Sequence, residues 1–206
     1  MISFARVNSD QWDDEPTFIS NTTDITLAPP IFSPYHHFDF SEGYVYAPRP
    51  AEPYQPVSKP HLAVFLTNGT GASNAVTGGY IHPGEIGSEV TAMDAFWFNA
   101  FSVYLGCDNA GPDVCRFEIS GYTFTGFSED EVLAYQQNAT TSPCPSRKNC
   151  QLEQVIFPSE IKGLSGLQIR AFVGEEQRIW FMDNLELGWY NTSCAAGLQR
   201  AQAPRR

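Results

Sequence analysis

Residues 95–124 read AFWFNAFSVYLGCDNAGPDVCRFEISGYTF, two runs of aromatic and β-branched residues on either side of a loop rich in Gly, Pro, Asn and Asp. Such runs favour extended backbone, and such loops favour turns. Cys107 and Cys115 bracket the loop, which predicts a disulfide that clips it closed. Cys144 and Cys150 bracket a second loop, CPSRKNC, and predict a second disulfide. Both spacings are too long for the cysteine knuckles of a zinc site.

Short runs of the same type recur along the chain, and no segment has a sustained helical stripe. Residues 128–137, SEDEVLAYQQ, begin with a helix-capping pattern. They follow a Gly-containing turn after RFEISGYTFTG, however, and are therefore predicted to be the return strand of a hairpin. About ten such runs indicate an antiparallel β-sandwich or jelly roll. We predict one all-β domain over residues 1–196 and a disordered basic tail over residues 197–206.

In two of the runs the apolar residues switch from one face of the strand to the other partway along. In the first, Phe98 and Phe101 fall on opposite faces of a regular strand. A bulge near Asn99–Ala100 would return both to the core. In the second, Ile119 and Tyr122 differ in the same way, and the glycine between them permits the same device. Bulged strands are typical of curved sandwich sheets.

The charge balance disfavours two classes of partner. The chain has 12 Lys and Arg against 23 Asp and Glu, a net charge of −11. Such a chain repels phosphate backbones and anionic lipid surfaces, so we expect no nucleic-acid partner. No apolar run approaches the length that spans a bilayer.

Other features are typical of an extracellular protein. Four N-glycosylation sequons occur, at Asn21, Asn68, Asn138 and Asn191. Disulfide-clipped loops belong to oxidising compartments. Cys194 is left without a partner, which predicts a disulfide to another chain or to a further part of a larger secreted protein. We therefore expect an extracellular location at a cell surface or cell wall.

Four stretches together resemble a known family: SPYHHFDFSEGYVYAP (33–48), KPHLAVFL (59–66), ISGYTFTG (119–126) and FMDNLELGW (181–189). They are similar to a fungal secreted β-sandwich module of unknown function, found C-terminally in Ser/Thr-rich cell-surface proteins. The last motif is shared with galactose-binding-like sandwiches, including carbohydrate-binding modules. The resemblance implies the fold and an extracellular setting, and no activity. Such modules often open with an acidic strand, whereas the opening ISFARV here has no acid.

The adjacent His36 and His37 raise the question of a metal site. On a strand they would point to opposite faces, so they would not both bind one metal. His37 and Asp39, with His61 or His82, would make a two-histidine, one-carboxylate iron site. The alternative is that the histidines simply pack between aromatic neighbours. No nucleophile elbow or other mutually arranged catalytic set is present, so we predict no enzyme. A metal-dependent jelly-roll enzyme or a polysaccharide hydrolase is the alternative.

Aromatic residues offer a possible binding surface. Tyrosines flank the proline-rich stretch of residues 48–60, and tryptophans lie elsewhere. Tyr and Trp rings can stack on sugars while their polar atoms stay in water. About half of these rings should belong to the core, because FSEGYVYA alternates like a half-buried hairpin. The predicted function is thus a structural or adhesive role, with carbohydrate binding as a further possibility, and the partners are cell-wall glycans or neighbouring wall proteins. The candidate ligand-binding residues are Tyr35, Tyr44, Tyr46 and Tyr54, and the tryptophans are Trp12, Trp97 and Trp189.

One carboxylate stands out in RIWFMDNLELGW, residues 178–189. In a regular strand Asp183 shares a face with Phe181 and Leu185 and so points into the core. A bare buried carboxylate is costly, so it must be hydrogen-bonded, paired or metal-bound. Either backbone N–H groups of a bulge or turn bind it, or it holds a structural calcium ion with oxygens from Asp13 and Asp14. Apart from that possible calcium ion, we expect no cofactor.

Overall fold

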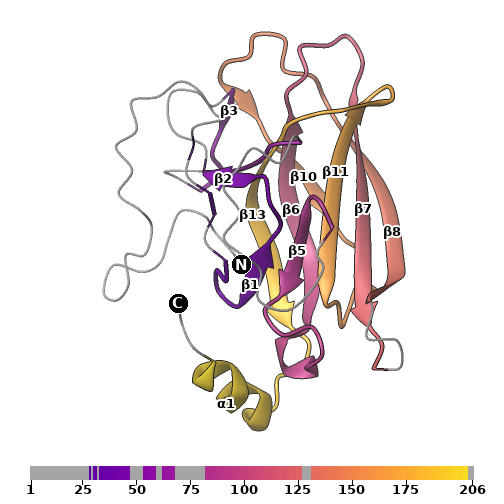
Figure 1. The fold of residues 1–206 in the computed structure, drawn as a ribbon. Coiled ribbons are helices and arrows are strands. Elements are labelled where there is room, and N and C mark those ends of the chain that lie inside the picture. The colour runs from indigo at the N-terminus through magenta and orange to yellow at the C-terminus, as the bar shows by residue number, and fades with distance from the viewer. Residues whose placement is uncertain are drawn as a thin grey trace.

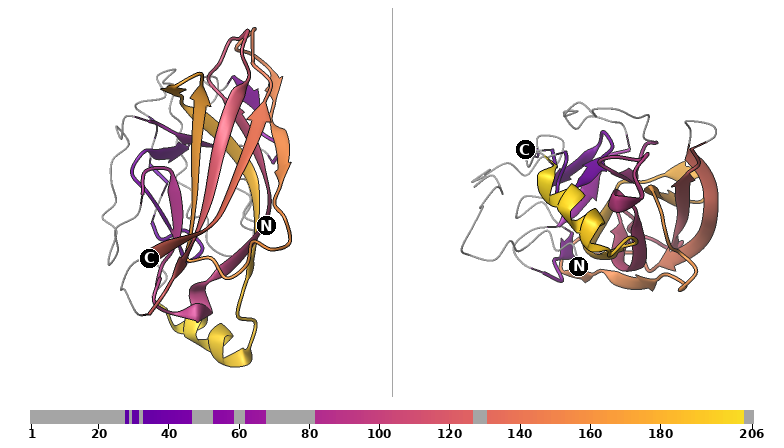
Figure 2. Two further views of the ribbon diagram at one scale, coloured as in Figure 1. Left: turned by 90° about the vertical axis from the view of Figure 1, so that its right-hand side faces the viewer. Right: turned by 90° about the horizontal axis from the view of Figure 1, so that it is seen from below.

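The computed structural model describes residues 28, 30–31, 33–46, 53–58, 62–67, 82–126 and 131–203. It confirms the predicted fold class: two antiparallel sheets pack face to face (Figures 1 and 2). The first sheet has the strand order β1-β5-β11-β7-β8, with β12 paired to β11, and the second has the order β10-β6-β13-β4-β2. No helix in the described ranges is long and apolar enough to span a membrane.

The elements are as follows. The strands of the first sheet are β1 (Phe38–Phe40), β5 (Glu85–Ser88), β11 (Gly166–Val173), β7 (Cys115–Phe124), β8 (Glu131–Thr141) and β12 (Glu176–Gln177). The strands of the second sheet are β10 (Glu153–Ile156), β6 (Phe98–Cys107), β13 (Trp180–Trp189), β4 (Ala63–Phe65) and β2 (Tyr44–Tyr46). Outside the two sheets lie the parallel pair β3 (Tyr54–Gln55) and β9 (Cys150–Gln151), the 3-10 turn η2 (Asp94–Phe96) and the helix α1 (Cys194–Gln202).

The main core lies between the sheets and contains Trp180, Phe117, Ile119, Leu105 and Leu167, all buried. Burying side chains of this size stabilises by about 1.5–3 kcal/mol each.

A second apolar cluster covers the outer face of the second sheet, where Phe181, Val45 and Val64 meet Tyr54. Strands β2, β4 and β13 are therefore buried on both faces. This is why YVY and AVF are apolar throughout rather than alternating.

The β6–β13 ladder has two irregularities, and they change the predicted faces of Phe101 and Asp183. Ala100 pairs with Leu187 and Ser102 with Glu186, so Phe101 is the extra residue on β6 and its side chain is 43% exposed. The predicted bulge exists, but it is one residue further along, and it leaves Phe101 outside the core. Between Glu186 and Asp183 the extra residue lies on β13, where Asn184 has a left-handed backbone (φ 47°).

The bulge in β13 decides where its side chains go. Trp180 and Met182 face the main core, and after the bulge Leu185 faces it again. Phe181 and Asp183 therefore point to the outer face of the second sheet. The prediction that Asp183 shares a face with Leu185 was wrong, because the strand is not regular.

The hairpin of β7 and β8 confirms the prediction that residues after 128 form a return strand. Its irregularity lies at the predicted glycine, but the extra residue, Ala134, is on β8. Strand β7 is itself regular. Tyr122 therefore points outward, where its hydroxyl donates to Gln168 Oε1 (3.0 Å), rather than joining Ile119 in the core.

The predicted disordered tail was wrong for residues 197–202, which belong to α1. Ser193 caps this helix by accepting from the N–H of Ala196 (3.2 Å). Ala196 packs in a small cluster with η2, and Arg200 lies 4.6 Å from the ring centroid of Trp189. Figure 1 shows α1 at the end of the sandwich opposite β3.

Candidate functional site

The two histidines form a tight turn and do not lie on a strand as predicted. Tyr35 and Phe38 exchange both backbone hydrogen bonds, at 2.8 and 3.0 Å. His36 (φ 52°) and His37 (φ 67°) occupy the two corner positions, both left-handed. This is the backbone of a type I′ hairpin turn, which normally takes Asn-Gly. Histidine is among the few non-glycine residues enriched there.

The turn brings His37 to a carboxylate and not to a metal cluster. His37 Nδ1 lies 2.8 Å from Glu89 Oε2, and its ring meets Phe96 and Trp189 edge-on. His82 instead stacks on Tyr122. Within the described ranges no three His, Cys, Asp or Glu side chains gather as metal ligands. The other residues named for a metal, His61, Asp13 and Asp14, lie outside those ranges.

The four candidate ligand tyrosines, Tyr35, Tyr44, Tyr46 and Tyr54, are core residues, none more than 9% exposed. The hydroxyl of Tyr44 donates to the carbonyl of Gly84 and that of Tyr54 to the carbonyl of Cys107, both at 2.9 Å. Their prediction as a sugar-stacking surface was wrong. The strand that carries two of them is covered on both faces.

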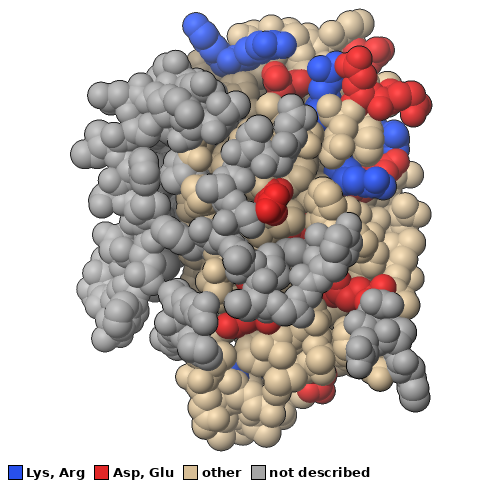
Figure 3. Space-filling model, in the orientation of Figure 1, with Lys and Arg blue, Asp and Glu red and all other residues tan. Residues whose placement is uncertain are grey.

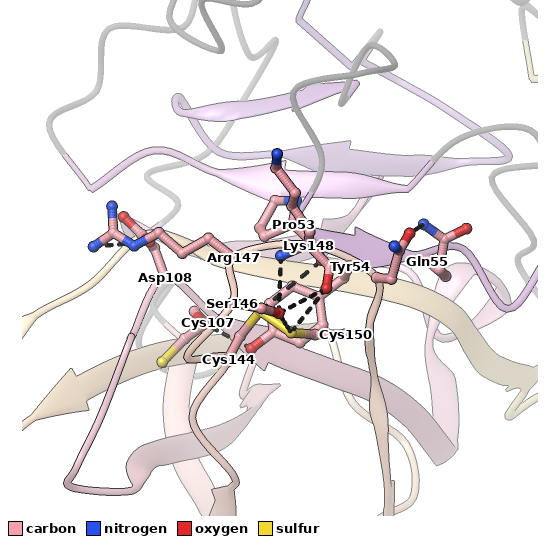
Figure 4. The surroundings of a disulfide bond; sticks show 11 residues. Pro53, Tyr54, Gln55, Cys107, Asp108, Cys144, Ser146, Arg147, Lys148 and Cys150 are labelled. Carbon is pink, nitrogen blue, oxygen red and sulfur yellow. Dashed lines mark hydrogen bonds and ion pairs between the residues drawn. A yellow bond between two sulfur atoms is a disulfide. The ribbon is translucent and has the colours of Figure 1, made fainter.

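Both predicted disulfides are present. Cys107–Cys115 joins the end of β6 to the start of β7 and thus links the two sheets. Cys144–Cys150 closes the loop beside β3, where the N–H of Cys150 donates to the carbonyl of Pro53 (3.0 Å; Figure 4). Cys194 is an exposed free thiol at the start of α1.

Asp183 is held by backbone N–H groups, the first of the two predicted explanations. Its Oδ2 accepts from Ser58 and its Oδ1 from Asn184, both at 2.7 Å. Asp183 is fully buried, which raises its pKa, and these N–H groups lower it part of the way back. The carboxylate thereby fixes residues 53–58 over the bulge of β13.

A second buried acid lies on the outer face of the first sheet. Glu85 is 0% exposed; its Oε2 accepts from the N–H of His82 (2.7 Å), while its Oε1 has no donor. The carboxyl of Glu131 approaches within hydrogen-bonding distance, and its buried Oε1 also has no donor. Burial, and then the negative charge of Glu131, raise the pKa of Glu85 to about 8.

Gly166 makes room for this pair of carboxyl groups, which we call the carboxyl pair. A Cβ at this position would lie 2.2 Å from Glu85 Oε1 and 3.3 Å from Glu131 Oε1. Sequence reasoning missed the pair, because 23 acids offer no way to select two. The pairing of Gly166 with Gly87 across β11 and β5 was the one usable signal, since adjacent glycines leave space above a sheet.

Asp39 extends the acidic character of this face. Burial and the nearby Glu89 raise its pKa to about 6. Figure 3 shows acidic side chains between the grey segments, with most Lys and Arg side chains in the upper part of the view. Burial thus raises the pKa values of two acids on one sheet face.

An exposed aromatic ring lies elsewhere, at the α1 end. Tyr190 is 50% exposed, and its ring centroid is 6.4 Å from that of Trp97. Trp97 Nε1 donates to the carbonyl of Thr91 (2.7 Å), which fixes its ring. Trp189, by contrast, stacks on Phe38. Trp12 lies outside the described residues.

The two describable sequons differ. Asn138 is exposed on the edge strand β8. Asn191 is half-buried, and its amide donates to Asp94 (3.1 Å) and accepts from the N–H of Ser193 (3.1 Å). Asn21 and Asn68 lie outside the described ranges.

Two packed antiparallel sheets, disulfide-clipped loops and buried acids define a β-sandwich module. The chain belongs to the family described as "Domain of unknown function (DUF7371)", which matches residues 8–200. This agrees with the predicted resemblance to a module of unknown function. No curated protein and no solved structure matches the chain.

Proposed function

We propose that this chain is a secreted, non-catalytic module of a fungal cell surface or cell wall, with a structural or adhesive role. The observation that carries the proposal is the pair of short-range disulfides. Each closes a surface loop, and such bonds persist in oxidising compartments. One links the two sheets and the other fixes the loop against β3, so both serve rigidity.

The use of the aromatic residues supports a structural role. The tyrosines that sequence reasoning assigned to ligands are packed in the core, and the hydroxyls of Tyr44 and Tyr54 tie strands and loops together. The exposed Asn138 would carry a glycan on the edge strand β8. Such a glycan would hinder pairing of this edge with another chain.

Secretion is tested by expressing the chain with a secretory leader and mapping its peptides without reduction. We expect Cys107–Cys115 and Cys144–Cys150 peptides, a glycan on Asn138, and a protein retained in the wall fraction. Retention lost on mild reduction would assign the attachment to Cys194, and Cys194→Ser is the matched control. Reduced cysteines in protein from its natural source would contradict the proposal.

Glycan binding is the second candidate, and the exposed Tyr190 beside the half-buried Trp97 favours it. The test is binding to chitin, β-glucan and mannan, comparing Tyr190→Ala with Leu198→Ala, which removes an exposed apolar side chain on α1. Affinity lost only in Tyr190→Ala would assign a glycan site there. No affinity for any of the three favours the purely structural role. Turnover of a polysaccharide would contradict both.

A further inference from the structure

We propose that Glu85 and Glu131 share one proton, and that this proton joins β5 to the start of β8 across the outer face of the first sheet. In the strand order these two strands are separated by β11 and β7. Their side chains nevertheless meet above Gly166, the position without a Cβ. A link between them would therefore brace four strands.

The hydrogen-bond inventory requires a donor between the two groups. Glu85 Oε1 and Glu131 Oε1 are both buried, and neither receives a hydrogen bond. Two ionised carboxylates in this position would repel each other at close range in a medium of low dielectric. A carboxylic acid that donates to a carboxylate removes one charge and satisfies both oxygens.

The described groups around the pair offer no other solution. The N–H of His82 is already bound to Glu85 Oε2, and its ring stacks on Tyr122. Arg170 on β11 is 2.7 Å from Glu118 and so is paired elsewhere.

The remaining titratable neighbours are the phenols of Tyr44 on β2 and Tyr122 on β7. The pKa of each is raised by burial first and by the charge of Glu85 second, so both are neutral. A calcium ion would need six to eight oxygens. The described residues supply only two carboxyl groups and no third metal-ligating side chain.

The sign of the pH effect follows from the raised pKa of Glu85. Its protonated form is favoured by folding, so the stabilisation is complete below its ordinary pKa of 4.5 and is lost as the pH rises through about 8. The shared proton therefore links β5 to β8 at acidic and neutral pH, and the link is lost at alkaline pH.

The test is the thermal midpoint between about pH 7 and about pH 9, in buffer with EDTA. Ordinary Asp and Glu groups are already ionised throughout this range, so their titration does not contribute. We expect the wild-type midpoint to fall by roughly 3–5 °C. Glu85→Gln supplies a permanent donor and should flatten the profile, and Glu131→Gln should do the same from the β8 side. Glu176→Gln, at an exposed site, should keep the wild-type profile.

Three results would overturn the proposal. The first is a flat wild-type profile. The second is an unchanged slope in Glu131→Gln, which remains informative if Glu85→Gln fails to fold. The third is a rise of the midpoint on adding calcium without EDTA at about pH 8, seen in the wild type and lost in either Gln variant. That result would show that a cation, not a proton, occupies the pair.

Discussion

The outer faces of the two sheets bury acids in opposite ways. On the second sheet, both oxygens of Asp183 accept backbone N–H groups, and the segment that supplies one of them covers the sheet. On the first sheet, Glu85 has one N–H donor and faces a second carboxyl group. Both side chains are fully buried, so burial alone does not distinguish them.

The difference lies in what the neighbouring chain provides. A bulge in β13 and a turn at residues 57–58 expose N–H groups that point at one carboxylate, and these offset part of the rise that burial causes in the pKa of Asp183. A regular strand pair offers no spare N–H groups above its surface, because these are used in the ladder. Glu85 receives one backbone N–H, from His82 at its Oε2. Its other oxygen, Oε1, must take a hydrogen bond from a side chain, and the side chain that faces it is another acid.

Replacing each buried acid by its amide should give the largest difference in stability between the two faces. In Asp183→Asn an NH₂ group would face a backbone N–H that has lost its acceptor, so we expect destabilisation by about 3 kcal/mol. Glu85→Gln replaces the proposed O–H donor by an N–H donor and should cost much less at neutral pH. Urea unfolding measures both. Equal losses in the two variants would contradict the comparison, and Asp108→Asn, an exposed pair with Arg147, controls for lost charge.

The next largest loss of stability should follow removal of Cys144–Cys150, the disulfide beside residues 53–58, which cover the outer face of the second sheet. The Cys144–Cys150 loop is short, so replacing both residues by Ser should cost about 2 kcal/mol. Hydrogen exchange should then increase in residues 53–58 and not in β7 or β11. An equal increase in hydrogen exchange in β7 and β11 would contradict the view that residues 53–58 cover the second sheet alone.

Asp39, on the outer face of the first sheet, should make the stability of the protein depend on pH in the acidic range. Its ordinary pKa is 3.8 and burial raises it to about 6, so its contribution is complete below 3.8 and lost as the pH rises through 6. We expect this step to be on the order of 1 kcal/mol and to disappear in Asp39→Asn. The measurement is unfolding free energy across that range. A step that persists in the variant would have to come from another group.

The smallest effect concerns a hydroxyl on the covered face. Tyr54→Phe keeps the ring in the second cluster and removes only the bond to the carbonyl of Cys107. The expected cost is about 1 kcal/mol. Tyr190→Phe, whose ring is half exposed, should be neutral in the same assay. An equally neutral Tyr54→Phe would mean that the hydroxyl does not hold the cover.

The sandwich and both disulfides follow from local signals. Runs such as FEIS predict strands, and each cysteine pair brackets its own turn. Tyr44 and Tyr46 were predicted to bind a ligand, but both point into the main core between the sheets. Val45, between them, faces the outer cluster, which a segment distant in sequence covers. Local periodicity contains no information about which face of this strand meets water.

The acids show the same limit. A buried Asp183 bound by N–H groups was predicted, but the face on which it lies depends on a bulge set by pairing with β6. The meeting of Glu85 and Glu131 depends on four strands and one glycine. The helix α1 was missed because its anchor is a cation–π contact of Arg200 with Trp189 and a small cluster with η2, not a hydrophobic stripe.

The most direct test of the different treatment of the two acids is a carbon-detected NMR titration of the Glu and Asp carboxyl groups. Assignment comes from the Glu85→Gln and Asp183→Asn spectra. We predict that the Glu85 carboxyl stays protonated at neutral pH and titrates at about 8. Titration of Glu85 near its ordinary value of 4.5 would contradict the account, because the carboxyl pair would then hold no proton at neutral pH.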